Sequence, residues 1–376
     1  MNEEKAIALI KKYKQGNLTK SEEGRLYEWY LLQAAESRAE LSPEEMEHTV
    51  ELIRNRLPLS QPDSSIRLWR RIGTIAAAVF LCLSGIYFFA YYKSSNPAGD
   101  QAVVMDILPG KTGATLTLSN GKQISLAEAA SGKIAEEAGL TVSKAPDGQI
   151  VYQAATDMDS GTDANAINTL STAKGETYML RLPDGSGIWL NSASSISYPL
   201  RLAHQNTRLV KISGEVYFEV AKDKKHPFVV ESRGQRVEVL GTHFNVNGYE
   251  NEDLTATTLV EGMVKVSSGK HSKIIRPGQQ ALTSKAGISL RQADLDNITD
   301  WKEGDFYLNH VEFKTAMRKI SRWYDVEVIY EEDFPEDLET GGWISRNNKL
   351  STVLKLIESS GQVHFRVQGR KVFVSK

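Results

Sequence analysis

IGTIAAAVFLCLSGIYFFAYY, residues 72–92, is an uninterrupted run of 21 residues without one charged side chain. As an α-helix rising about 1.5 Å per residue it would be roughly 30 Å long, the thickness of a bilayer's hydrocarbon core. Its tyrosines gather near the far end, which suits a membrane interface. The alternative, a helix of a protein core, must be buried on every side. The run predicts one transmembrane helix and hence a bitopic membrane protein.

Basic residues are distributed unequally around this run. Five arginines occupy the 21 positions before it, whereas Lys93 and Lys111 are the basic residues in the 21 positions after it. Because positive charge stays on the cytoplasmic side, the N-terminus is predicted to be cytoplasmic and the larger C-terminal part to lie outside. The single cysteine, Cys82, falls inside the run, so there is no disulfide framework. The sequence therefore predicts a bacterial inner-membrane protein with a periplasmic C-terminal part.

Composition argues against several classes of function. The net charge of −2 and the locally balanced N-terminal segment are unlike the basic face of a nucleic-acid-binding protein. The seven histidines show no ligand spacing that would indicate a metal site. There is no phosphate-binding glycine loop and no nucleophile elbow. We expect no cofactor, no metal and no enzyme acting on another molecule.

Residues 1–66 show three amphipathic helical patterns, the second beginning at a capping box of Thr19 and Glu22. Leu26, Trp29 and Tyr30 share one face of that second helix. Their apolar stripe can form the internal core of a small bundle. Alternatively, the small bundle can complete its core against a partner protein, with the aromatic residues as the main contacts. We take these three residues as the candidate partner contact.

The outer part begins with β-patterned sequence. Alternating apolar residues interrupted by glycine-containing turns predict hairpins at 116–126 and 180–190. Further short β-runs continue at intervals of about 8–14 residues, which is typical of an all-β sandwich, jelly roll or solenoid. The last 75 residues differ, because a helix–strand pattern from Val311 recurs 37 residues later. This duplication predicts a compact α+β module that could offer a strand edge to a partner.

These patterns divide the chain into five predicted parts. They are a helical domain at 1–66, a transmembrane helix at 72–92, a linker with a first β-hairpin at 93–170, an all-β domain at 171–296 and an α+β signalling module at 300–376.

The dipeptide Gly241–Thr242 interrupts a β-patterned run, VLGTHFNV. A glycine at such a place usually marks a β-bulge. Alternatively, a strained Gly–Thr bond can bring the threonine hydroxyl onto the preceding carbonyl, convert the amide to an ester and allow hydrolysis. The sequence leaves both interpretations open, the second being single-turnover self-cleavage.

Several consecutive blocks carry a family resemblance. GETYMLRLPDGSGIWLNSASSISYP, SGEVYFEVAKDKKHPFVVES, VLGTHFNV and LVEGMVKV occur in this order. Together with the terminal module, they resemble the FecR-type transmembrane anti-sigma factors in the form frequent among Bacteroidetes. The terminal module is similar to the short N-terminal domain of secretins and TonB-dependent transducers. The resemblance spans about residues 115–376.

The resemblance implies a regulatory mechanism. The cytoplasmic domain would sequester an extracytoplasmic-function sigma factor, and the outer part would receive a signal from an outer-membrane TonB-dependent transducer. Some relatives cleave themselves at a Gly–Thr bond, here Gly241–Thr242, before an intramembrane protease acts. The alternative is a bitopic periplasmic binding or scaffold protein, for glycans or other envelope components, with no sigma-factor partner.

Overall fold

The computed structural model describes residues 106–137, 140–146, 149–154, 166–202, 206–332 and 334–376, together with Lys5, Ala8, Leu9, Lys12, Glu22 and Arg25. The predicted transmembrane run at 72–92 lies outside the described residues, as does the predicted helical domain at 1–66 apart from these six positions. The residues from 106 onward belong to one compact unit.

The predicted fold class needs correction. The described part is mainly β, with 26 strands and three helices, and no helix in it is long and apolar enough to cross a bilayer. The longest of these helices has 12 residues, about 18 Å. The described residues therefore show neither the helical bundle nor the transmembrane helix of the predicted fold class. The described chain is a β-sandwich followed by an α+β module.

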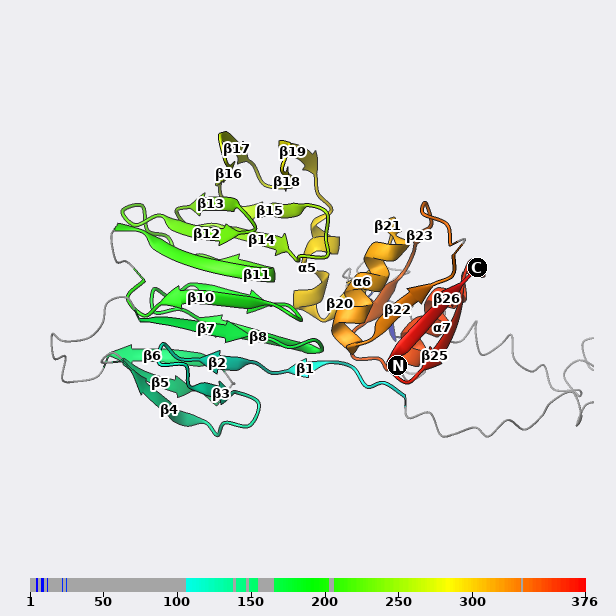
Figure 1. Cartoon of the computed structure of the whole chain (residues 1–376), viewed down its shortest axis with the longest axis horizontal. Coiled ribbons are helices and arrows are strands. Elements are labelled where there is room, and N and C mark those ends of the chain that lie inside the picture. Colours follow the sequence, from blue (N-terminus) through cyan, green and yellow to red (C-terminus); the bar gives the residue numbers. More distant parts are fainter. Residues whose placement is uncertain are drawn as a thin grey trace, which may run out of the picture. The chain divides into compact units, whose positions relative to one another are not determined.

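Two sheets form the sandwich (Figure 1). The first sheet has the order β3-β2-β7-β10-β11-β12-β13-β16-β17. Its strands are β2 (Thr115–Thr117), β3 (Gln123–Ser125), β7 (Ile167–Ser171), β10 (Ser195–Pro199), β11 (Arg208–Glu219), β12 (Phe228–Ser232), β13 (Gln235–Val239), β16 (Val264–Ser268) and β17 (His271–Ile275). The β2–β3 pair is the hairpin that alternation predicts at 116–126.

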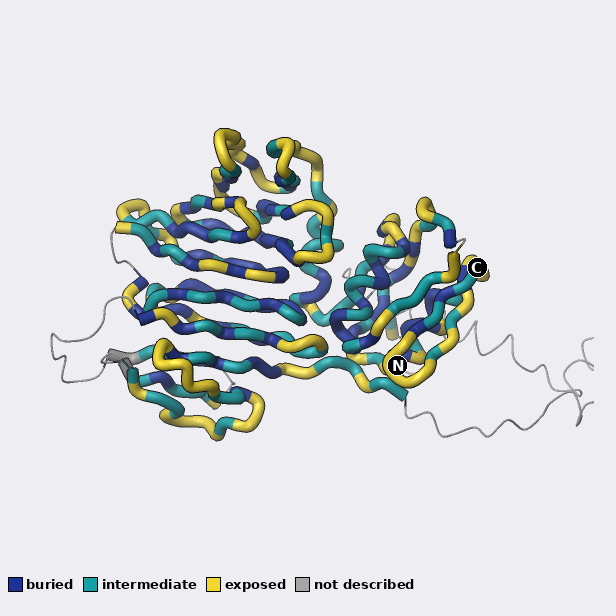
Figure 2. Tube along the Cα trace, viewed as in Figure 1, coloured by how far each residue is buried: buried dark blue, intermediate teal, exposed yellow. Residues whose placement is uncertain are grey.

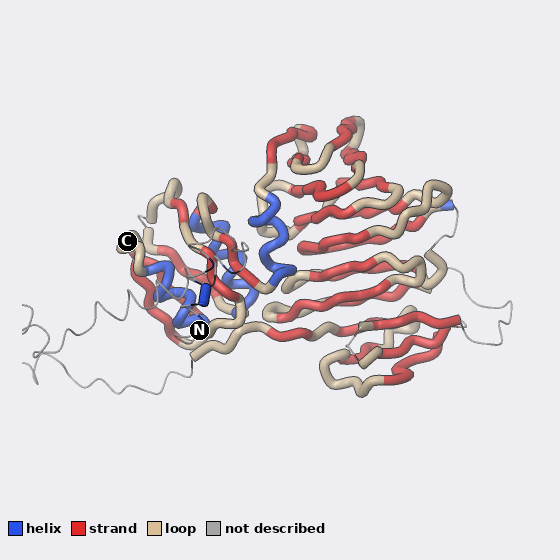
Figure 3. Tube along the Cα trace, turned by 180° about the vertical axis from the view of Figure 1, so that it is seen from behind, coloured by secondary structure: helices blue, strands red, loops and turns tan. Residues whose placement is uncertain are grey.

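The second sheet has the order β4-β5-β6-β8-β9-β11-β14-β15-β18-β19. Its further strands are β4 (Gly132–Glu137), β5 (Leu140–Lys144), β6 (Ile150–Ala154), β8 (Glu176–Arg181), β9 (Gly187–Leu190), β14 (His243–Gly248), β15 (Thr255–Glu261), β18 (Gln279–Ser284) and β19 (Gly287–Gln292). The short β1 (Lys111–Thr112) pairs in parallel with β8. Figure 3 shows these strands in regular succession from behind.

Strand β11 belongs to both sheets. Its first half pairs with β10 and β12, and its second half pairs with β9 and β14. The change occurs at Gly214, whose φ is +83°. A Cβ there would lie 2.7 Å from the Ser194 Cα and 2.8 Å from the Ala193 carbonyl oxygen. Only glycine combines this dihedral with so close an approach of backbone.

The core draws its residues from strands of both sheets, and Figure 2 shows buried residues along these strands in dark blue. Inward positions alternate along each strand, as in β14, where Phe244 and Val246 are both fully buried. The Phe218 and Phe244 rings stack with centroids 4.8 Å apart. Burying one such side chain contributes about 1.5–3 kcal/mol, so this continuous apolar layer holds the two sheets together.

Helix α5 (Leu295–Glu303) follows the sandwich, capped by the Asp294 side chain at its start and ended by Gly304. The terminal module then comprises β20 (Asp305–Tyr307), β21 (Val311–Glu312), α6 (Phe313–Tyr324), β22 (Glu327–Tyr330), β23 (Glu339–Thr340), β24 (Trp343–Ser345), α7 (Leu350–Glu358), β25 (His364–Gln368) and β26 (Lys371–Ser375). The α6–β22 and α7–β25 units occupy the positions of the 37-residue duplication. Strand β26 lies between β22 and β25. One apolar cluster fills the module.

Candidate functional site: a buried polar network between sandwich and module

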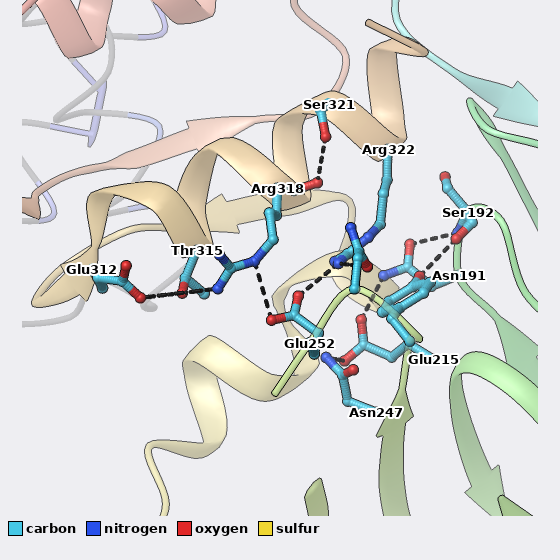
Figure 4. Close-up of polar contacts among 12 residues, drawn as sticks. Asn191, Ser192, Glu215, Asn247, Glu252, Glu312, Thr315, Arg318, Ser321 and Arg322 are labelled. Carbon is cyan, nitrogen blue, oxygen red and sulfur yellow. Dashed lines mark hydrogen bonds and ion pairs between the residues drawn. The ribbon is translucent and has the colours of Figure 1, made fainter. Parts of the chain in front are cut away.

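Glu215 is a buried carboxylate at the first position of β11 after Gly214. Strands β9 and β14 flank this half of β11, so amide side chains near both of them reach it. Glu215 accepts hydrogen bonds from Asn191 Nδ2 at 2.8 Å and from Asn245 Nδ2 at 3.0 Å (Figure 4 shows Glu215 with Asn191). Burial raises the pKa of Glu215, while Lys319 and the two amide donors oppose that rise.

Arg346 connects the module to this carboxylate. It follows β24, and its Nη1 donates to Asn191 Oδ1 at 3.2 Å, so Asn191 bridges Arg346 and Glu215. Burial lowers the pKa of Arg346, whereas Asp300 and Glu215 raise it. A buried guanidinium without such partners would be an uncompensated charge, which is energetically costly. The partners therefore hold the Arg346 side chain in its position.

Aromatic rings of the module hold Arg346 in place. Its guanidinium lies 4.6 Å from the ring centroid of Phe306 and 5.2 Å from that of Trp323. The Trp323 indole Nε1 also donates to the Arg346 carbonyl oxygen at 2.9 Å. The side chain that reaches the sandwich is thus anchored in the module's own core.

A second set of contacts comes from helix α6. Arg318 and Arg322 are four residues apart and therefore project from one helix face. Both pair with Glu252, Arg322 Nη2 at 2.6 Å and Arg318 Nε at 3.1 Å (Figure 4). The guanidinium carbon of Arg322 also lies 3.8 Å from the ring centroid of Tyr249. The Tyr249 hydroxyl donates to the Ser192 carbonyl oxygen at 2.6 Å.

We call these residues the junction network. Its members are Asn191, Glu215, Asn245, Tyr249, Glu252, Arg318, Arg322 and Arg346. A cavity of about 300 Å³ adjoins it, lined by Glu215, Lys319 and Arg322 among others. Glu252 of the sandwich forms ion pairs with Arg318 and Arg322 of the module, and Asn191 links Glu215 to Arg346. A displacement of the module would break these contacts between two separately cored parts. Such an arrangement is suited to coupling the positions of two domains.

The residues predicted from the sequence lie elsewhere. Gly241–Thr242 lies in the connection from β13 to β14, and a register shift follows between His243 and Phe244. Gly241 has a φ of +150°, and a Cβ on it would lie 2.7 Å from the Lys222 Cα. Thr242 is buried, and its Oγ1 donates to the Met263 carbonyl oxygen at 3.2 Å. The predicted partner contacts Leu26, Trp29 and Tyr30 lie outside the described residues.

The junction network is absent from the sequence-based prediction, although two signals for it exist. Glu215 is an acidic residue beside the apolar run Val216–Phe218, on the strand face opposite the core residues Val216 and Phe218. Arg318 and Arg322 share one face of a helix whose other face is apolar. Neither signal identifies its partner, because the partners are distant in sequence.

The raised pKa of Glu215 makes stability depend on pH. In the folded state the neutral form is favoured, so Glu215 stabilises the fold below its unfolded pKa of about 4.3. That contribution is lost as pH rises through the folded pKa. We expect the difference in free energy of unfolding, wild type minus Glu215→Gln, to fall as the pH is raised from 4 to 8, through the folded pKa. Each unit of pKa elevation corresponds to about 1.4 kcal/mol.

Urea denaturation across this pH range measures the effect. Glu250→Gln removes an exposed carboxylate and serves as the control. A constant wild-type-minus-variant difference from pH 4 to pH 8 would contradict the assignment of Glu215 as a buried carboxylate that resists ionisation.

Comparison with known proteins identifies two domain families. One lies in the β-sandwich and the other in the α+β module, and buried polar contacts join the two parts. Residues 168–265 match the family described as FecR protein, and residues 305–374 match the family described as FecR, C-terminal. The chain therefore carries both FecR domains, which confirms the resemblance seen in the sequence.

Two solved structures are similar to the chain. Both are crystal structures of a candidate anti-sigma factor from Parabacteroides distasonis ATCC 8503, at 1.65 and 2.50 Å resolution. The first is 28% identical with a TM-score of 0.52, and covers 55% of this chain and 98% of that chain. The second is 27% identical with a TM-score of 0.52, and covers 56% and 99%. No match was found among curated proteins.

Proposed function

We propose that the chain is an anti-sigma factor that holds an extracytoplasmic-function sigma factor and releases it on a signal from an outer-membrane TonB-dependent transducer. The observation that carries the proposal is the match of both the FecR and the FecR C-terminal families on one chain. The similar candidate anti-sigma factor supports the same role. In this proposal, residues 106–376 face the periplasm and residues 1–66 hold the sigma factor through Leu26, Trp29 and Tyr30.

The terminal module is the proposed receiver. Its sheet has β22 and β25 as outer strands, so either can accept a partner strand by β-augmentation. A groove of about 330 Å³ lies between β23 and the C-terminal end of α7, lined by Phe313, Leu338 and Val363 among others. A transducer domain docked there would act on the module, and the junction network would carry the displacement to the sandwich. Intramembrane proteolysis would complete the release.

The sigma-factor contact has a direct test. Trp29→Ala combined with Tyr30→Ala is expected to abolish co-purification of a small sigma factor with the full-length tagged chain, and to raise transcription of its target genes at least tenfold. Aromatic side chains supply most of the energy at such contacts, and losing two of them commonly costs several kcal/mol. Affinity purification with mass spectrometry provides the measurement.

Glu28→Ala provides the matched control, because the predicted helix places it opposite the apolar face. Equal retention of the sigma factor by the double variant would show that the contact lies elsewhere. A wild-type chain that captures no sigma factor would favour the envelope binding or scaffold alternative.

A further inference from the structure

The end of the sandwich carries an unusual distribution of charge. Residues 262–293, here called the basic tip, contain six lysines and arginines and one histidine but no acidic residue, although the whole chain has a net charge of −2. The tip comprises β16, β17, β18 and β19 with their turns. Its cationic residues are Lys265, Lys270, Lys273, Arg276, Lys285 and Arg291.

The fold brings these cations to one exposed end. Strand β17 is the last strand of the first sheet and β19 the last of the second, and the two hairpins lie side by side (Figure 1). A Cβ on Gly287 would lie 3.7 Å from the His271 ring, so the β16–β17 and β18–β19 turns are neighbours. Lys270 and Lys285 in these turns are both exposed, as Figure 2 shows for the turn regions.

The charges of the tip are not neutralised within the described part of the chain. None of the six cations forms an ion pair there. Lys265 lies opposite Glu238 in the β13–β16 register, yet the two form no ion pair. Arg291 donates to the Gln280 side-chain oxygen at 2.7 Å and lines the cavity that Glu215 and Glu252 also line, so it faces the junction network and the other five cations form the positive surface. The tip therefore presents a positive surface that an anionic partner can neutralise.

Large apolar side chains are exposed among these cations. Met263, Ile274 and Leu290 are 64%, 59% and 41% exposed. They are three of the seven exposed large hydrophobic residues of the described chain. Lysines on outer strands are commonly explained as protection against edge-to-edge aggregation. That explanation covers Lys273 on β17, but not the charged turns or the exposed apolar residues.

We propose that the basic tip docks on the surface of an anionic lipid bilayer. Lysine and arginine side chains pair with lipid phosphates, while exposed apolar side chains enter the headgroup region, so a mixture of both matches this surface. Charges placed on two turns and two outer strands can meet an extended surface together, whereas an added protein strand would cover one edge only. The inference does not depend on the proposed regulatory function.

The test uses the full-length chain with a fluorescent reporter on the tip. An environment-sensitive dye is attached to Ser289→Cys in a Cys82→Ser background, and vesicles of phosphatidylcholine with 30% phosphatidylglycerol or of phosphatidylcholine alone are added. The expected signal change occurs with the anionic vesicles only and weakens at high salt. Lys270→Glu, Lys273→Glu and Lys285→Glu together should require at least about 100-fold more anionic lipid.

Two controls decide the outcome. Lys122→Glu, Lys211→Glu and Lys355→Glu together make the same charge change at exposed positions elsewhere, and should bind as the wild type does. A dye on Ser131→Cys, in the turn before β4, should report no contact. Equal responses to both vesicle types, equal loss in both triple variants, or a tip that captures an acidic protein but no vesicle would each overturn the proposal.

Discussion

Replacing Arg346 with alanine is expected to lower the free energy of unfolding by about 3–5 kcal/mol, the usual cost of removing one partner from a buried polar pair. The variant loses the hydrogen bond to Asn191 and the stacking on Phe306 and Trp323. Asn191 would still donate to Glu215, but it would no longer link that carboxylate to a cation. Urea denaturation followed by tryptophan fluorescence measures the loss.

The effect on coupling can be separated from the effect on packing. Arg346→Met keeps a flexible apolar side chain against Phe306 and Trp323 but cannot donate to Asn191, so it should recover much of the stability. We nevertheless expect it to loosen the module, with increased hydrogen exchange in α6 and a weakened transcriptional response to the inducing signal.

The surface variant Arg236→Ala provides the control, since it removes an exposed arginine and should change stability by no more than about 0.5 kcal/mol. Unchanged exchange in α6 for both Arg346 variants would show that the junction network does not hold the module. A double-mutant cycle between Arg346 and Asn191 would then give no coupling energy.

The parts of the fold that depend on residues close together in the chain can be predicted from the sequence. The hairpins β2–β3 and β8–β9 follow from alternation and a glycine turn, because both strands and their turn lie within one short segment. The α6–β22 and α7–β25 units follow from the 37-residue duplication. In each case the periodicity of the apolar residues already specifies the buried face.

Features that depend on contacts between distant parts of the chain cannot be predicted in this way. Nothing local shows that β11 leaves one sheet for the other at Gly214, since the reason is the approach of Ser194. Arg322 and Glu252 are 70 residues apart, and Arg346 and Asn191 are 155 residues apart. The fold-class prediction is corrected because the described architecture follows from many short strands, whereas the predicted bundle at 1–66 and the predicted span at 72–92 fall almost entirely outside the described residues.

We expect the peptide bond between Gly241 and Thr242 to be cut in the wild-type chain and to remain intact in the Thr242→Ala variant. In the proposed reaction the Thr242 hydroxyl oxygen bonds to the Gly241 carbonyl carbon, and the C–N bond breaks. The hydroxyl proton passes to the freed nitrogen, and water then hydrolyses the ester. Thr242→Ser keeps the nucleophile and should still be cut.

The topology predicts how the products behave. Strand β13 precedes the bond and pairs with β16, while β14 follows the bond and pairs with β11. The two fragments would therefore remain one strand-paired complex under native conditions and separate only on a denaturing gel, with Thr242 as the new N-terminus by mass spectrometry. Gly241 itself should not be replaced in this test, because a Cβ would strike Lys222 and disturb the fold. A single intact band for wild type and Thr242→Ser, with and without inducing conditions, would show that the glycine serves only the turn between β13 and β14.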